Sequence, residues 1–457
     1  MLPHESVSAV SRALQAARET RRLELGPGAL NQVAPVFQHL FPGQCARVVV
    51  DPTTFAVAGR RVLEALRATG VPCREPFIYA HPNLYAEQKH VIALEAALAV
   101  DGAIPVAVGS GTINDLTKLA ANRTGRQYLA VATAASMDGY TAFGASITEH
   151  GSKRTFPCPA PVALIADLDI IVAAPRDLNA AGYADLLAKT TAGADWLLAD
   201  ALGVEFIHPQ AWRIVQGHLR AALSHPAGVP QCAPSVLRQL TEGLVLSGLA
   251  MQVARSSRPA SGAEHQFSHL WDMQHHTCNG RIPWHGFKVG LGTLAMAALY
   301  EHLLTLPLHH LDVDFCCAHW PDLTSLPDTV RAAFGESDLA KVALEETRAK
   351  WIDVGALRSQ LETLRRLWPE LKIRLHQQLL PSRQVRAMLA AAGAPVDPEQ
   401  IGLSRAQLRQ CSWHAYLLRR RFTALDLAVR CGVLNSCLDG IFGCNGLWPL
   451  TAQKSGG

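Results

Sequence analysis

Three histidines lie close together in the sequence and have the residue type and spacing to hold one metal ion. His265 and His269 are four residues apart, and His285 follows in the segment Pro283-Trp-His-Gly286. Two imidazoles four apart on a helix share one face, and imidazole nitrogen is a common ligand of divalent ions. The spacing alone does not decide which two of these histidines would bind the ion. His265 with His269 is the default pair, whereas His265 with His285 requires a loop to fold back.

A carboxylate ligand for such an ion has to come from elsewhere in the chain. Asp185, in Gly182-Tyr-Ala-Asp-Leu-Leu-Ala-Lys189, is a candidate because we expect it in the first turn of a helix that begins at small residues. The alternative is a carboxylate that only interacts favourably with the helix dipole. The neighbouring pair His275-His276 is interpreted as a surface or packing feature.

A glycine-rich loop, Gly109-Ser-Gly-Thr-Ile-Asn-Asp115, has the composition of a phosphate-binding turn. A strand that enters such a loop and a helix that leaves it surround an anion with backbone N–H groups, and glycine lets a pyrophosphate approach closely. Asp51 ends an earlier predicted strand, where a carboxylate can accept hydrogen bonds from ribose hydroxyls. A tight turn without a ligand also explains the loop, and a turn or N-cap before Pro52 also explains Asp51. Together, the histidines and the loop suggest a metal-assisted enzyme that uses a nucleotide cofactor.

The elements that must position these residues alternate between strands and helices over about the first 175 residues. Strands are expected at residues 46–50, 75–79, 103–108, 128–133 and 161–166, and helices at residues 58–69, 90–100 and 115–122. This alternation predicts a parallel, doubly wound α/β sheet. In such sheets ligands bind beyond the carboxyl ends of the strands, which is where the glycine loop lies.

Helical periodicity dominates the rest of the chain, with apolar spacing typical of helices at residues 183–202, 234–255 and 287–304. We therefore expect an α/β dinucleotide-binding domain over residues 1–175. A mostly α-helical metal- and substrate-binding domain is expected over residues 176–430, and a tail of unknown role over residues 431–457.

Composition excludes several classes of protein. Of the 457 residues, 49% are apolar and 18% charged, which is enough for a large core and argues against wholesale disorder. No apolar run is long enough for a membrane span, and no signal peptide is recognised. The eleven cysteines are scattered without a Cys-x-x-Cys pair, as expected of reduced thiols in a cytoplasmic protein. The net charge of +4 is small, and the arginines and lysines are dispersed along the chain, so nothing in the sequence indicates nucleic-acid binding.

Five segments in this order and spacing resemble one family. They are Gly109-Ser-Gly-Thr-Ile-Asn-Asp-Leu-Thr-Lys118, Ala135-Ser-Met-Asp-Gly-Tyr140, Gly182-Tyr-Ala-Asp-Leu-Leu-Ala-Lys189, Ser257-Arg-Pro-Ala-Ser-Gly-Ala-Glu-His265 and His285-Gly-Phe-Lys-Val-Gly290. The chain is similar over about residues 20–430 to the bacterial type of sn-glycerol-1-phosphate dehydrogenase. That family belongs to the superfamily of iron-containing alcohol dehydrogenases, glycerol dehydrogenases and dehydroquinate synthases. The resemblance implies a dehydroquinate synthase-like fold.

The resemblance also implies roles for individual residues. Asp185, His265 and His285 would bind the metal, and His269 would line the substrate pocket instead. Asp138, Asp185 and His269 would form the catalytic and substrate-contacting group. The dinucleotide would contact Asp51, Gly109, Gly111, Thr112, Ile113, Asn114, Asp115, Thr133, Ala134, Ala135 and Ser136. The family often has serine four residues after the aspartate matched by Asp138, and this chain has Ala142 there.

The implied activity is reversible reduction of dihydroxyacetone phosphate to sn-glycerol 1-phosphate with NADH or NADPH. A zinc, nickel or iron ion would act as a Lewis acid on the carbonyl, and His269 or a water molecule at the metal would relay a proton. Candidates for the substrate phosphate are Arg258, Lys153, Arg154 and Lys288. A cytoplasmic homodimer is also expected.

Three other functions share part of this pattern. A dehydroquinate synthase-like cyclase shares the fold, NAD and metal but consumes no net NADH, and the segment Ser257–His265 argues against it. A glycerol dehydrogenase needs no phosphate on its substrate. A nucleotide-binding regulatory protein on the same scaffold would have lost the metal ligands, whereas Asp185, His265 and His285 are all present.

Overall fold

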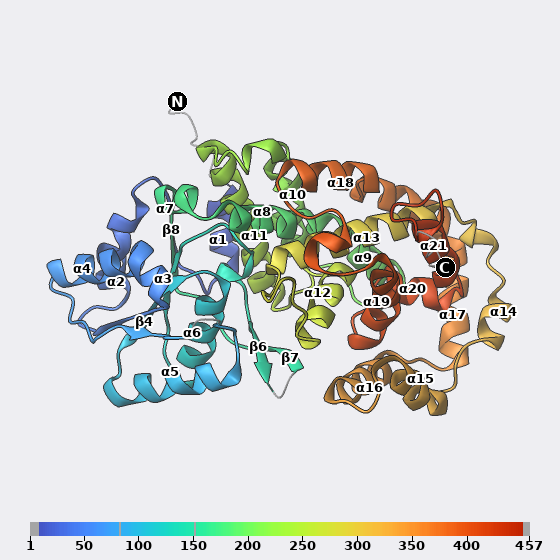
Figure 1. The fold of residues 1–457 in the computed structure, drawn as a ribbon, viewed down its shortest axis with the longest axis horizontal. Helices are drawn as coiled ribbons and strands as arrows, with labels where there is room; N and C mark the ends of the chain where they lie inside the picture. Colours follow the sequence, from blue (N-terminus) through green and yellow to red (C-terminus); the bar gives the residue numbers. More distant parts are fainter. Residues whose placement is uncertain (1–8, 82–83, 150–151, 451–457) are drawn as a thin grey trace, which may run out of the picture. The chain divides into compact units, whose positions relative to one another are not determined.

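The computed structural model describes residues 9–81, 84–149 and 152–450, and the chain divides into two compact units (Figure 1). Unit 1 comprises Met1–Leu186, His208–Ala260 and Ala391–Gly393. Unit 2 comprises Leu187–Ile207, Ser261–Ala390 and Ala394–Gly457. Residues 208–260, which we expected in the helical domain, belong to unit 1 in this division. The functional domains expected from the sequence stay a prediction.

A six-stranded sheet forms the centre of unit 1, and all its neighbouring strands are parallel. Its order is β1-β8-β5-β4-β2-β3. The strands are β1 Arg22–Gly26, β2 Ala46–Val50, β3 Phe77–Ile78, β4 Ile104–Gly109, β5 Leu129–Ala132 and β8 Ala163–Asp167. The predicted parallel α/β sheet is therefore confirmed. The sequence missed β1 and predicted β3 too long.

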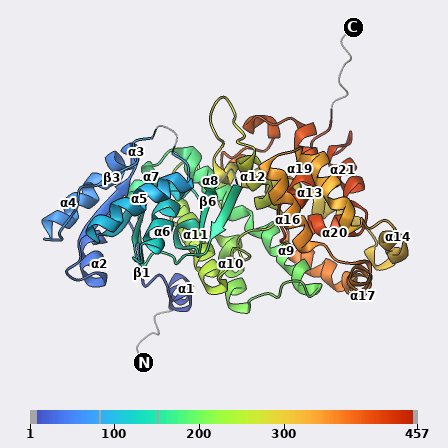
Figure 2. The same ribbon diagram turned by 90° about the horizontal axis from the view of Figure 1, so that it is seen from below.

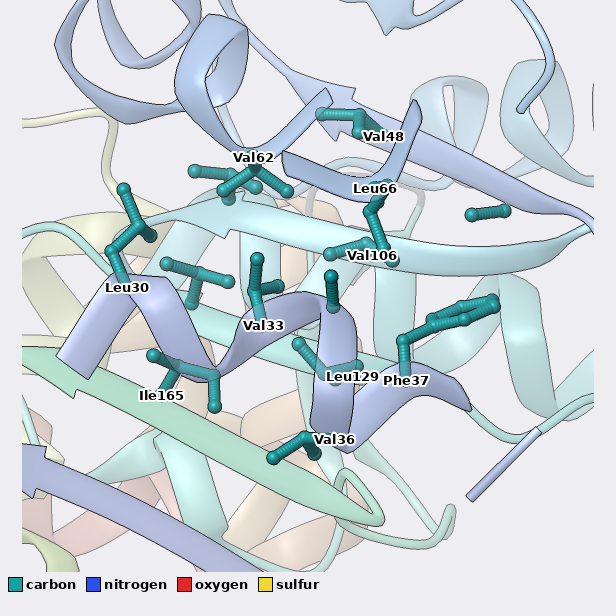
Figure 3. Close-up of a cluster of buried hydrophobic side chains, with 14 of the residues drawn as sticks. Leu30, Val33, Val36, Phe37, Val48, Val62, Leu66, Val106, Leu129 and Ile165 are labelled. Atoms are coloured by element: carbon teal, nitrogen blue, oxygen red, sulfur yellow. The ribbon is translucent and has the colours of Figure 1, made fainter. Parts of the chain in front are cut away.

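Helices cover both faces of this sheet because its strands are apolar on both faces. Alternate strand side chains form one buried cluster with α2 (Val33–Leu40) and α4 (Arg60–Ala68), as Figure 3 shows for Val33, Val62 and Val106. The helices α5 (Gln88–Asp101) and α6 (Gly111–Arg123) pack side by side in Figures 1 and 2, and α6 packs against β4. Helices and strands thus form three layers in unit 1.

The strand order places a topological switch point between β2 and β4. The chain leaves β2 toward β3 on one side, and leaves β4 toward β5 on the other. Ligands of doubly wound sheets bind at such a point, beyond the carboxyl ends of the strands. Asp51 follows β2 and the glycine loop follows β4, so the two segments expected to bind the cofactor flank the switch point.

The remaining elements of unit 1 include an antiparallel hairpin that the sequence did not indicate, β6 (Ala145–Glu149) with β7 (Ser152–Phe156). Its other helices are α1 Ala9–Ala17, η1 Ala29–Gln32, α3 Pro52–Thr54, η2 Phe55–Gly59, η3 Gly139–Thr141, α7 Leu168–Ala173, α8 Arg176–Leu187, α10 Pro209–Ala222, η4 Pro226–Gly228 and α11 Pro234–Ala254. The helical periodicity predicted over residues 183–202 is confirmed, and the structure divides this stretch between α8, which ends at Leu187, and a second helix that begins at Lys189.

Over the described part of unit 2 the regular elements are helices, with one isolated antiparallel bridge between Cys278 and Arg281, which agrees with the mostly α-helical C-terminal fold that was predicted. Its elements are α9 Lys189–Ala201, α12 Ala263–Met273, α13 His285–Thr305, η5 Leu308–His310, α14 Val313–Ala318, η6 Leu323–Ser325, α15 Leu326–Phe334, α16 Asp338–Lys350, α17 Val354–Gln378, α18 Ser382–Ala391, η7 Pro398–Ile401, α19 Arg405–Leu418, α20 Ala424–Arg430 and α21 Leu434–Phe442. The helices α12 and α13 pack closely against each other.

The described part of the expected tail is ordered within unit 2. Helix α21 lies in it, and the Trp448 ring is fully buried with its Nε1–H donating to the Val396 carbonyl at 3.2 Å. Residues 451–457 lie outside the described residues. Among the described helices, none combines the length and apolar character needed to span a membrane.

Candidate active site

The glycine loop in unit 1 joins β4 to α6 in the way the sequence predicted. Gly109 ends the strand, Ser110 is the N-cap and Gly111 is the first helical residue. The Ser110 side chain makes no capping bond, and the first N–H donated back into this turn is that of Asn114, to the Ser110 carbonyl at 3.0 Å. The N–H groups of Gly111, Thr112 and Ile113 therefore have no partner within the helix. This arrangement suits the pyrophosphate of a dinucleotide.

The side chains of Asn114 and Asp115 are engaged with the protein. Asn114 donates to the Gly139 carbonyl at 3.1 Å and accepts from the Tyr128 hydroxyl at 3.1 Å. Asp115 accepts the backbone N–H of Ser146 at 3.2 Å. Burial raises the pKa of Asp115, and the nearby Lys118 ammonium opposes that rise. Both side chains thus hold the segment from Gly139 to Ser146, and their predicted contact with the dinucleotide stays a prediction.

Lys118 fastens the same segment to α6. Its ammonium donates to the carbonyls of Gly139, Ala142 and Gly144 at 3.0, 2.9 and 3.0 Å, and its side chain is fully buried. A buried cation is stable only when its donors are satisfied, and three carbonyls satisfy this one. The sequence did not single out Lys118, although it ends the first family motif.

The second expected cofactor segment, Thr133–Ser136, lies beside the glycine loop. The Thr133 N–H donates to the Gly109 carbonyl at 3.2 Å, and the Ala135 N–H donates to the Asn179 side chain at 3.1 Å. Gly182 of α8 packs directly on this segment, since a Cβ at Gly182 would overlap the carbonyl oxygen of Ala135. The loops after β4 and β5 therefore lie side by side at the carboxyl ends of the strands.

Asp51 caps a helix. Its Oδ1 accepts the Thr54 N–H at 2.8 Å, and its own N–H donates to the Thr54 hydroxyl at 3.0 Å. This reciprocal pair is a capping box at the start of α3. The interpretation as an N-cap before Pro52 is confirmed, and a contact with the ribose stays a prediction.

Two carboxylates and a serine form a hydrogen-bonded chain in unit 1. The Asp138 N–H donates to Asp185 Oδ2 at 3.1 Å, and the Ser247 hydroxyl donates to Asp138 Oδ2 at 2.8 Å. Asp185 and Ser247 are fully buried, and Asp138 is 9% exposed. The sequence missed Ser247 because it lies on α11, far along the chain.

The predicted place of Asp185 at a helix start was wrong. Asp185 lies in the last turn of α8, which begins at Arg176. A carboxylate near a helix C-terminus is repelled by the helix dipole, so the dipole does not explain this residue. The Asp138 N–H provides one compensating donor.

The three histidines lie in unit 2. His265 and His269 are on α12, as predicted, whereas His285 is the first residue of α13 and not part of a loop. The ring centroids of His265 and His285 are 5.5 Å apart, so the structure brings these two together. His269 is partly exposed on the same helix as His265. His276 is bonded to the Ile401 carbonyl at 2.6 Å, which agrees with a packing role.

A polar partner holds Nδ1 of each of the two paired histidines. Nδ1 of His265 is 2.8 Å from Oε1 of Glu264, and Nδ1 of His285 is 3.2 Å from the Ser268 hydroxyl. Burial tends to raise the pKa of Glu264, but the bond and charge of His265 and the Gly262 N–H outweigh it, so the pKa is lowered. Glu264 is therefore a buried carboxylate that holds the His265 ring.

The four phosphate candidates differ in their surroundings. Lys288 is ion-paired with Asp272 of α12, a partner that the sequence did not indicate. Arg258 is almost fully buried in unit 1. Lys153 and Arg154 lie on β7 and are at least partly exposed.

Comparison with known proteins places the chain among dehydrogenases. Residues 24–175 match the family model of iron-containing alcohol dehydrogenases. A glycerol-1-phosphate dehydrogenase (NAD(P)+) of Halalkalibacterium halodurans is 37% identical over 286 residues, which are 62% of this chain and 71% of that protein. One of Geobacillus thermodenitrificans is 30% identical over 416 residues, 88% of this chain and 91% of that protein.

Two solved structures share the fold. A probable glycerol dehydrogenase of Sinorhizobium meliloti has a TM-score of 0.58 at 15% identity, covering 92% of this chain and 96% of that one. The glycerol dehydrogenase of Schizosaccharomyces pombe has a TM-score of 0.58 at 14% identity, covering 92% and 90%. With relatives this similar over most of their own length, the chain belongs to the glycerol-1-phosphate dehydrogenase family.

Proposed function

We propose that this protein reduces dihydroxyacetone phosphate to sn-glycerol 1-phosphate, reversibly, with NADH or NADPH. The observation that carries the proposal is the 30% identity to the Geobacillus thermodenitrificans enzyme over 88% of the chain, because that stretch includes every motif described above. The name of that relative gives the product, and NAD(P)+ as the cofactor. On the resemblance alone, we also propose a homodimer in the cytoplasm.

We propose that Asp185, His265 and His285 hold one divalent metal ion. Glu264 accepts from Nδ1 of His265, which leaves the lone pair of that ring on Nε2, the atom that would face a metal. The ring of His285 lies next to it. One carboxylate and two imidazoles suit zinc, nickel or iron(II).

Chain connectivity allows Asp185 to belong to this centre. Asp185 precedes Thr191 by six residues, and the Thr191 hydroxyl donates to Glu264, the neighbour of His265, at 3.0 Å. Six residues span at most about 20 Å even when fully extended. This upper limit is compatible with Asp185 as a ligand, and the assignment of Asp185 rests on the family resemblance.

The bound metal would supply Lewis acidity toward the substrate carbonyl, and NAD(P)H would supply the hydride. The side chains of the protein would orient the substrate and move a proton. Ser247 fixes the carboxylate of Asp138, which we propose to accept a hydrogen bond from a substrate hydroxyl. We propose that His269 delivers the proton to the reduced oxygen. Arg258, Lys153, Arg154 and Lys288 stay the candidates for binding the substrate phosphate.

The direct test is oxidation of NADH or NADPH by the purified, metal-loaded protein, with and without dihydroxyacetone phosphate. We expect oxidation that depends on the ketone. Tightly held NAD with no net consumption of NADH would indicate a sugar phosphate cyclase and contradict the proposal.

Replacing His269 should separate substrate chemistry from metal binding. We expect His269→Ala to keep its metal and to lose turnover by about 10²–10⁴-fold, the usual contribution of a positioned proton donor. Metal content by mass spectrometry and steady-state kinetics measure the two effects. Loss of the metal from this variant would instead favour His265 and His269 as the ligand pair.

Replacing Gly111 should weaken dinucleotide binding. A Cβ at Gly111 would lie 3.3 Å from Met137, and the two further methyl groups of valine would occupy the space that a pyrophosphate needs. We expect Gly111→Val to bind NADH at least about tenfold more weakly by titration calorimetry, a loss of about 1.4 kcal/mol. Gly217→Val on α10 is the matched control, because a Cβ there meets nothing within 4 Å. Unchanged NADH affinity in Gly111→Val would refute the assignment of this loop.

A further inference from the structure

Glu264 is a fully buried carboxylate next to the paired histidines, and its three contacts are well defined. It accepts from His265 Nδ1 at 2.8 Å, from the Gly262 N–H at 2.5 Å and from the Thr191 hydroxyl at 3.0 Å. Its exposed fraction is 0%. These contacts fix the position of both carboxylate oxygens and, through one of them, the His265 ring.

The charge of Glu264 needs a counter-charge. Burying an isolated carboxylate is costly unless it is paired with a cation or coupled to a metal. Over residues 9–81, 84–149 and 152–450, the basic side chain that the structure pairs with Glu264 is His265, which is charged only when protonated, and not a lysine or arginine. If a neutral His265 binds a divalent ion through Nε2, the positive charge of the ion would stabilise the Glu264 carboxylate through the histidine ring.

We propose that Glu264 is a positioning residue for the metal centre. It fixes the tautomer and orientation of His265 and makes Nε2 a stronger donor to the ion. Carboxylates that hold a metal-binding histidine in this way contribute about 10–100-fold to metal affinity. This inference rests on the proposed metal centre. Glu264 of α12 also accepts a hydrogen bond from Thr191 of α9, and the inference gives Glu264 a role in metal affinity in addition to that link between the two helices.

The test compares metal affinity across matched variants, measured by competition with a chromophoric chelator for Zn²⁺ on the full-length protein. Glu264→Gln keeps the shape and the acceptor oxygen but removes the charge. We expect it to bind Zn²⁺ about 10–100-fold more weakly than the parent protein. If Glu264→Gln does not fold, Glu264→Asp is the second variant. Its shorter side chain keeps the negative charge but moves it away from Nδ1 of His265, so we expect the same loss of Zn²⁺ affinity.

Two control variants separate this role from a purely structural one. Thr191→Val removes the bond from α9 to Glu264 but leaves the pair of Glu264 and His265 intact. Asp426→Asn removes a buried charge elsewhere in unit 2, where Asp426 caps α20 through Thr423 and pairs with Lys350. Both should lower the melting temperature, and both should change Zn²⁺ affinity much less than Glu264→Gln.

The outcomes distinguish this inference from the proposed function. Equal Zn²⁺ affinity in the parent protein and in His285→Ala would overturn the metal centre itself. Tight binding in the parent protein with unchanged affinity in Glu264→Gln would overturn only the role of Glu264. An equal loss in Thr191→Val and Glu264→Gln would show that Glu264 acts by joining α9 to α12, which would also overturn it.

Discussion

His285→Ala is expected to abolish turnover and to lose its metal while the fold stays largely intact. The change removes one of three proposed ligands. Residues that only hydrogen-bond to a metal ligand already contribute about 10–100-fold to metal affinity. Removal of a direct ligand should therefore lower metal affinity by more than about 100-fold. His285 is the first residue of α13 and only half-buried, so few packing contacts depend on it. Metal content, far-ultraviolet circular dichroism and turnover measure the three properties.

The matched control for this prediction is His276→Ala. His276 is also half-buried in unit 2, but its ring is bonded to the Ile401 carbonyl and lies outside the proposed ligand set. We expect that variant to keep its metal and its turnover, with some loss of thermal stability. Full metal content together with parental turnover in His285→Ala would show that the ligand assignment is wrong.

The second large effect concerns the substrate. A site built for a phosphate holds fixed donors that unphosphorylated dihydroxyacetone leaves unpaired, and each unmet buried donor costs about 1–3 kcal/mol. Since about 1.4 kcal/mol corresponds to a factor of ten, several donors should favour the phosphorylated ketone by at least about 100-fold in kcat/KM. Kinetics with both ketones, each with NADH and NADPH, measure the ratio.

Arg258→Met keeps much of the apolar bulk of a buried arginine and removes its charge. If Arg258 binds the phosphate, the preference for the phosphorylated ketone should shrink while turnover of dihydroxyacetone changes little. Equal or better turnover of dihydroxyacetone by the parent protein would instead indicate a glycerol dehydrogenase.

The central sheet could be predicted because its strands are buried on both faces and appear as apolar runs. Val48, Val49 and Val50 show no exposed face, and the same is true of β4 and β5. The edge strand β1, Arg-Leu-Glu-Leu-Gly, alternates polar and apolar residues over only five positions. The sequence signal of such a short edge strand is weak, and β1 is defined by its pairing with β8.

Helix boundaries near the site were harder to predict, since small residues there serve packing. Gly182 was interpreted as the start of a helix, but it lies within α8, where a side chain would collide with Ala135. Pro283 suggested a loop around His285, yet a helix begins at that histidine. At Gly182, a residue type that often ends or begins a helix instead allows α8 to pack closely on Ala135.

Positioning residues could not be predicted from one sequence, because each depends on a distant partner. Ser247 meets Asp138 across 109 positions of the chain, and Thr191 meets Glu264 across 73. Only the folded backbone brings such pairs together. The chemistry-bearing motifs were recognised as segments, whereas the contacts that orient their side chains came from the tertiary structure.

The configuration of the product tests the central claim most directly. The protein is incubated with dihydroxyacetone phosphate and NADH or NADPH, and the glycerol phosphate formed is offered to a dehydrogenase specific for the sn-3 isomer. We predict a product that this second enzyme does not oxidise, which is sn-glycerol 1-phosphate. A product that it oxidises completely, or no glycerol phosphate with either cofactor, would contradict the proposed function.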